Sequence, residues 1–230
     1  MTVSLNTRRT VGRVALAGLL GAVAPLLAQT IVPVEQEPVH KTVFENDLVR
    51  VIDAALPVGH ATLYHTHARD NVPVAVAGGR VATVRIGGEP VETAVKVGDV
   101  SFAEGGYTHV VRNVGTTPLH FIDVELRTSA PATSAAHAVP VSSAGHALAL
   151  ANARVWLHRV VVAPGRRLEA HRHAGPLLEV IVGGEVVALG AGAPATVEAG
   201  QHRWRGDGAV DAVRNAGRVP YEVVEIEWVK

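Results

Sequence analysis

The sequence contains two copies of one pattern, and this duplication is the feature that most limits the fold. One set of residues recurs 106 positions later: Asn46, Gly59, His65 and His67 become Asn152, Gly165, His171 and His173. A second set recurs 102 positions later: Gly98, Gly106, Asn113, Pro118, Asp123 and Glu125 become Gly200, Gly208, Asn215, Pro220, Glu225 and Glu227. Because stacked solenoid repeats need roughly three or more copies, we expect two barrels with separate cores.

Both copies consist of short Val-rich segments separated by glycine turns, which is typical of strands. The predicted strands of the first copy are residues 49–56, 61–67, 72–77, 81–86, 91–95, 109–112 and 119–126. In the last of them, Ile122 and Val124 alternate with Asp123 and Glu125. The sequence predicts an all-β protein with barrels at residues 40–127 and 146–230, joined by an Ala/Ser/Pro-rich linker at residues 128–145.

The N-terminus has the pattern of an export signal. Arg8 and Arg9 precede residues 14–28, a stretch without charge. That stretch is shorter than the roughly 20 residues that cross a bilayer, and it suits a signal peptide. We expect residues 1–28 to be removed, leaving an exported, periplasmic or secreted protein without a stable membrane anchor. A retained anchor is the alternative, and the arginine pair leaves the general and twin-arginine export routes open.

The charge balance argues against a nucleic-acid partner, because 21 basic residues face 21 acidic ones and no basic excess attracts phosphate. The predicted chemistry lies in a His-x-His pair. On a strand over residues 61–67, His65 and His67 point the same way, with Leu63 beside them. A third imidazole, His109, comes from another strand. Three imidazoles on one face predict a divalent metal site; Fe, Zn, Ni and Cu suit imidazole, and Mn favours an added carboxylate.

The spacing of these residues resembles the two sequence motifs of the cupin family. The first motif matches at Gly59, His65, His67 and Gly78, with Asn71 at its Glu position. The second motif matches at Gly98, Gly106, His109 and Asn113, with Glu104 at its Pro position. The resemblance implies two tandem cupin barrels, or double-stranded β-helices, with a metal inside near the open mouth.

The departure at Asn71 bears on the chemistry. The resemblance implies a ligand at this position, and an amide offers neither charge nor useful basicity. Either the Asn71 oxygen or the adjacent Asp70 carboxylate coordinates the metal, or water takes the position. The resulting three-His arrangement is similar to that of iron-dependent dioxygenases acting on thiols, diketones and dihydroxybenzoates. A mechanism that needs a glutamate base beside the metal lacks it here.

The second copy departs further from the motifs. His171 and His173 are present, but Asp211 stands at the third histidine position and the Glu position falls near Leu177. His171, His173 and Asp211 form a weaker candidate site, a two-His-one-carboxylate set; the alternative is a purely structural barrel. Other histidines have no partner at ligand spacing, and we expect no metal role for them: His120, His137, His146, His158 and His202.

Two functional hypotheses follow. The first is an exported metal-binding bicupin that acts as an iron-dependent dioxygenase on a small organic substrate. The second is a non-catalytic cupin that binds a metal or small ligand, or serves as an assembly module; pairing into a homodimer fits either. The cavity should separate them, because an enzyme needs polar groups that converge on an open metal position. A cavity filled by Leu and Val side chains would favour the second.

Overall fold

The computed structural model describes residues 30–128, 145–208 and 210–229. The described residues form strands, loops and one short 3-10 helix, Val34–Gln36. The predicted signal peptide lies outside them, as do His137 and nearly all of the predicted linker. In the described part of the chain, no helix has the length and apolar character needed to cross a membrane.

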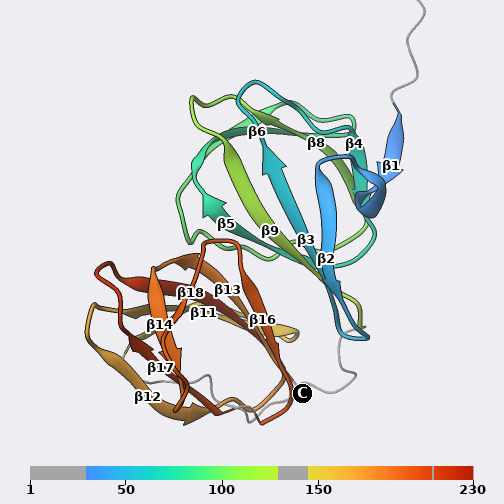
Figure 1. Cartoon of the computed structure of the whole chain (residues 1–230). Coiled ribbons are helices and arrows are strands. Elements are labelled where there is room, and N and C mark those ends of the chain that lie inside the picture. The colour runs from blue at the N-terminus through green and yellow to red at the C-terminus, as the bar shows by residue number, and fades with distance from the viewer. Residues whose placement is uncertain (1–29, 129–144, 209, 230) are drawn as a thin grey trace, which may run out of the picture.

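The first half of the chain folds into two sheets that curve around a common interior (Figure 1). One sheet has the order β2-β3-β9-β5 and the other β1-β4-β8-β6-β7. The strands are β1 Ile31–Pro33, β2 His40–Glu45, β3 Val49–Leu56, β4 Tyr64–His67, β5 Asn71–Ala77, β6 Gly79–Arg85, β7 Val91–Val95, β8 Tyr107–Asn113 and β9 Leu119–Leu126. The bounds of β3, β7 and β9 are those predicted. The sequence did not predict β1 and β2.

The second half repeats this arrangement. Its strands are β10 His146–Ala151, β11 Val155–Val162, β12 Arg167–Arg172, β13 Leu177–Gly183, β14 Val186–Leu189, β15 Ala195–Thr196, β16 His202–Arg205, β17 Val210–Asn215 and β18 Tyr221–Trp228. The sheet orders are β10-β11-β18-β13-β16 and β12-β17-β14-β15. The order β10-β11-β18-β13 reproduces β2-β3-β9-β5, strand for strand. The all-β prediction with two barrels is confirmed.

The recurring asparagines are structural. Asn113 donates from Nδ2 to the carbonyls of Leu56 (3.0 Å) and Thr117 (2.8 Å), and its Oδ1 accepts from the Gly115 N–H (3.0 Å). Asn215 makes the same three bonds 102 residues on, to Val162, Val219 and Gly217. Each side chain ties the end of one strand to a turn, which explains its recurrence without a functional role.

The prediction of separate cores holds only in part: each barrel has an apolar cluster of its own, but a further cluster is common to both. The alternating faces of β9 and β18 that carry Val124 and Ile226 belong to a single buried cluster with side chains from both halves. Strands β5 and β13 contact each other across this boundary, and the sheets that contain them face one another in Figure 1. The opposite faces of β9 and β18, which carry the acidic residues, therefore point into the two barrels.

Candidate metal centre

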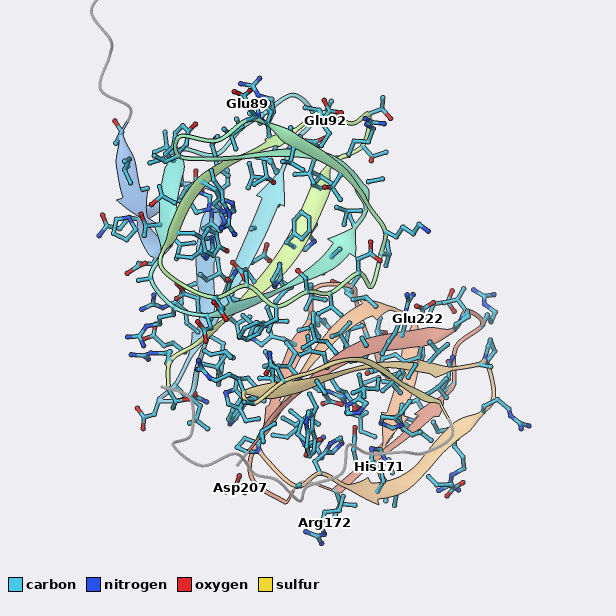
Figure 2. The ribbon with its side chains drawn as sticks, turned by 180° about the vertical axis from the view of Figure 1, so that it is seen from behind. Glu89, Glu92, His171, Arg172, Asp207 and Glu222 are labelled. Carbon is cyan, nitrogen blue, oxygen red and sulfur yellow. The ribbon has the colours of Figure 1, made fainter. Side chains whose placement is uncertain are left out.

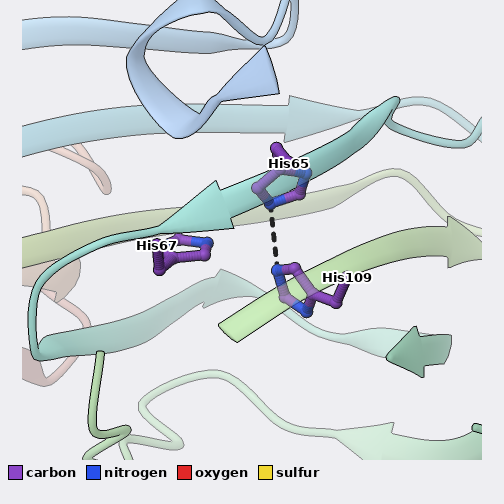
Figure 3. Close-up of side chains that lie close together, drawn as sticks. All are labelled: His65, His67 and His109. Atoms are coloured by element: carbon purple, nitrogen blue, oxygen red, sulfur yellow. Dashed lines mark hydrogen bonds between the residues drawn. The ribbon is translucent and has the colours of Figure 1, made fainter. Parts of the chain in front are cut away.

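His65, His67 and His109 converge inside the first barrel. Strand β4 pairs with β8 so that His65 lies opposite His109. Their Nε2 atoms are 2.9 Å apart (Figure 3), and one ring nitrogen from each histidine lies within 4.8 Å of the others. Two nitrogens bound at right angles, each about 2.1 Å from an ion, would be about 3 Å apart. The spacing therefore fits one cation.

Local bonding prepares His65 as a ligand. Its Nδ1 lies 3.0 Å from the Leu63 carbonyl, so Nδ1 carries the proton and Nε2 offers its lone pair to the interior. Leu63 was expected beside the histidines, and this expectation was wrong. Strand β4 begins only at Tyr64, so the alternation does not reach Leu63, whose side chain is 40% exposed.

Burial keeps the three imidazoles neutral, which is the form that binds a metal. It lowers the pKa of His65. Burial, together with the neighbouring histidines, lowers the pKa of His67 to about 3 and that of His109 to about 2. The buried Nδ1 of His67 has no hydrogen-bond partner. A cation would satisfy such a cluster without protonating it.

Asn71 takes part in a hydrogen-bond chain beside the histidines. Its Nδ2 donates to Asp123 Oδ1 at 2.8 Å, and its Oδ1 accepts from the Tyr107 hydroxyl at 3.0 Å. Tyr107 in turn stacks on His67, with ring centroids 4.9 Å apart. Both ends of the Asn71 amide therefore bond protein groups in this structure.

Two further side chains line the same space and were missed by the sequence reasoning. Asp123 projects from β9 and places Oδ2 3.5 Å from Nδ1 of His67; burial raises its pKa, although the bond from Asn71 opposes this. His40 from β2 has its ring 4.6 Å from that of His65, and its Nδ1 lies 2.6 Å from Glu37. A usable signal existed: His40 recurs as His146 at the offset of 106 that His65 and His67 obey.

These residues surround a cavity of about 280 Å³. Polar groups gather at the histidines, and apolar side chains such as Val81, Val111 and Phe121 form part of the remaining wall. The space at the site is therefore open rather than filled by Leu and Val.

In the second barrel, the predicted residues fall into different groups. His171 on β12 lies opposite Asp211 on β17. His171 shares a potential ligand group with His146 and Glu225, whereas Asp211 shares one with Glu179 and Glu225. His173 interacts with Glu227, its Nδ1 3.2 Å from the carboxylate. His146 and Glu225 come from strands of the other sheet, which motif spacing does not bring into view.

Comparison with known proteins identifies the fold. No protein-family model matches the sequence, and no curated protein matches it. Among solved structures, the chain is similar to a cupin 2 conserved barrel domain protein from Leptotrichia buccalis: 13% identity, 84% of this chain, 88% of that chain, TM-score 0.53. It is also similar to an oxalate decarboxylase from Lactobacillus farciminis: 14% identity, 82% of this chain, 80% of that chain, TM-score 0.58.

A third similar structure is the salicylate 1,2-dioxygenase from Pseudoaminobacter salicylatoxidans: 12% identity, 79% of this chain, 71% of that chain, TM-score 0.54. At such identities the likeness concerns the fold alone. The protein has the cupin fold, and its histidine-rich interiors are candidate metal sites.

Proposed function

We propose that this protein is an exported bicupin whose first barrel binds one divalent cation through His65, His67 and His109 and acts on a small organic substrate as a dioxygenase-type enzyme. The observation that carries the proposal is the convergence of three imidazoles, two of them buried and one half-buried, at ligand spacing on an open cavity. Iron is the metal that we expect, because a three-His set with free positions suits a metal that must hold two reactants side by side.

The cavity supports an enzyme over a passive binder. Its volume of about 280 Å³ is near the lower limit of ligand pockets, roughly 300 Å³, so the substrate would be small. Among the described residues that line it there is no Lys or Arg, and an anionic group would therefore depend on the cation for neutralisation. Polar groups converge beside the histidines, as catalysis requires.

The bound metal would supply Lewis acidity and adjacent positions for two reactants. Side chains of the protein would donate and accept the protons. Asp123 is an acidic side chain in the cavity lining, next to Asn71, which stands at the motif's Glu position. Asn71 fixes the Asp123 carboxyl and the Tyr107 hydroxyl relative to each other. Asp123 would hold or release a proton at Oδ2, on the side that faces His67.

The export, the small-molecule partner and a homodimer are part of the same proposal. Residues 1–28 would direct the protein to the periplasm or outside the cell and would then be removed. The two fold neighbours named as a dioxygenase and a decarboxylase set a class of chemistry for the first assays, not a substrate.

The test combines elemental analysis of the mature protein with variants. His65→Ala and His109→Ala should remove the cation of the first barrel, while His60→Ala, an exposed histidine, should leave it in place. Asp123→Asn should keep the cation and slow oxygen uptake with small aromatic and thiol substrates by roughly 100-fold or more, the range of general acid–base catalysis.

A cation content that neither histidine variant lowers would overturn the metal assignment of the first barrel; a cation in the second barrel would persist in both variants and is tested separately below. A bound cation without oxygen uptake across the substrate panel would leave the non-catalytic, metal-binding cupin as the function.

A further inference from the structure

The interior of the second barrel holds an excess of buried polar atoms without partners. In the described part of the first barrel one such side-chain atom occurs, Nδ1 of His67. The second barrel has many, including both ring nitrogens of His158, Nε2 of His171 and of His173, Oε2 of Glu179, Oδ2 of Asp211 and Oε1 of Glu225. Buried polar groups are normally paired, so such a cluster calls for a ligand.

Three strands of the second barrel place potential ligand atoms close together. His146 on β10, His171 on β12 and Glu225 on β18 each offer an atom within 4.8 Å of the others. Nε2 of His146 lies 3.1 Å from Oε2 of Glu225, and the rings of His146 and His171 have centroids 4.7 Å apart. Figure 2 shows His171 on the part of this barrel that lies away from the first barrel.

His171 is held in the same way as its counterpart in the first barrel. Its Nδ1 lies 3.0 Å from the carbonyl of Glu169, just as His65 Nδ1 lies 3.0 Å from that of Leu63. The proton therefore sits on Nδ1, and the lone pair of Nε2 is available. That Nε2 atom is buried and has no hydrogen-bond partner. The ring orientation of His171 is therefore that of a metal ligand: Nδ1 bonds the backbone and Nε2 is left for an ion.

Further buried oxygen atoms surround Glu225. Glu179 and Asp211 lie within 4.8 Å of Glu225 through one oxygen each, and all three carboxyl groups are at most 2% exposed. Arg203 contacts Glu179 at 2.7 Å, and Arg205 lies 3.6 Å from Asp211. Among the described residues, no arginine is paired with Glu225, whose Oε2 instead lies 3.1 Å from His146 and 4.0 Å from His173. Glu225 thus faces the histidines and is not paired with either of these arginines.

We propose that the second barrel binds its own divalent cation through His146, His171 and Glu225. This is a two-His-one-carboxylate set, distinct from the three imidazoles of the first barrel. Such a set with a carboxylate oxygen suits Mn²⁺ and Fe²⁺. The inference stands independently of the catalytic role proposed for the first barrel.

The experiment uses Mn²⁺ as the probe and the full mature protein after chelator treatment. The double variant His65→Ala/His109→Ala removes the first site, so any remaining cation reports on the second barrel. We expect one bound Mn²⁺ per chain by equilibrium dialysis. The electron paramagnetic resonance spectrum of that Mn²⁺ should show coupling to imidazole nitrogen.

In this background, His146→Ala and Glu225→Gln should each weaken Mn²⁺ binding by at least about 10-fold, since loss of a direct ligand should cost no less than loss of a supporting contact. His202→Ala, a histidine of the same barrel outside the group, should change it little. Circular dichroism verifies folding, and His146→Gln serves if the alanine variant does not fold.

Absence of Mn²⁺ from the folded background variant would overturn the proposal. So would binding that persists in His146→Ala, or a spectrum without nitrogen coupling, which would place the ion on the carboxylates alone. Those results would identify His146 and Glu225 as a structural ion pair.

Discussion

The two barrels share a scaffold but differ in their interiors. Asn113 and Asn215 make the same three hydrogen bonds. At interior positions, by contrast, His109 corresponds to Asp211, and Ile52 to His158. The comparison shows that the same backbone accommodates different interior side chains when the turns and strand pairings are retained.

The electrostatics of the two interiors also point in opposite directions. Burial lowers the pKa of the three histidines in the first barrel. In the second barrel, burial also disfavours the charged form of His173, but the bond to Glu227 outweighs it and the pKa of His173 is raised. Burial and the nearby Asp211 raise the pKa of Glu179 to about 8. The three histidines of the first barrel are therefore disfavoured in their protonated form, whereas His173 and Glu179 of the second barrel are favoured in theirs.

The largest expected effect concerns what the barrels share. Ile226 is fully buried in the common core, so Ile226→Ala should destabilise the protein by about 2–5 kcal/mol. Both barrels should still unfold together. All three Trp residues lie in the second half, so their fluorescence reports that barrel while far-ultraviolet circular dichroism reports both. Separate transitions in urea would show that the barrels are independent, and Ile122→Ala is the matched variant from the first barrel.

A second prediction exploits the opposite electrostatics in metal-free protein. Below the usual histidine pKa of 6.5, His67 and His109 are protonated in the unfolded chain. In the folded protein they stay neutral until the pH falls to about 3 and about 2, respectively. Stability from these two residues is therefore present above pH 6.5 and lost as the pH falls. The loss from pH 7 to pH 5 should be on the order of 2 kcal/mol for each residue.

The measurement is denaturant unfolding across this range, with His109→Phe as the comparison. The variant should show a weaker acid dependence. His173 has the opposite sign, because its stabilising charge is present at low pH and is lost as the pH rises through its raised pKa. Glu227→Gln should therefore steepen the acid loss, and an unchanged profile in both variants would contradict the contrast between the barrels.

The smallest expected effect tests the equivalence of the scaffolds. Asn113→Ala and Asn215→Ala should each cost about 1–3 kcal/mol, because each leaves buried backbone groups without partners. The two losses should agree closely, since the bonds are the same. Thermal unfolding of the two variants provides the comparison, and a loss confined to one of them would show that one barrel dominates stability.

The sequence alone determined the repeated scaffold and the core of the first site. Glycines and asparagines at constant offsets marked the turns, and strand alternation placed His65 and His67 on one face because that rule is local. The same locality explains the limits of the method. Strand alternation placed Leu63 beside the histidines, although β4 begins only at Tyr64. Sequence spacing also did not reveal that His146 lies near His171 and Glu225.

Tertiary structure decided which face of each final strand is the interior. Alternation separates Val124 from Asp123 and Ile226 from Glu225, but it does not distinguish inside from outside when both faces are buried. The apolar faces pack between the barrels, so the carboxylates turn inward. The closure of the two sheets then places His40 of β2 beside His65, and His146 of β10 beside His171. These neighbours are distant in the chain, and their proximity depends on how the sheets close.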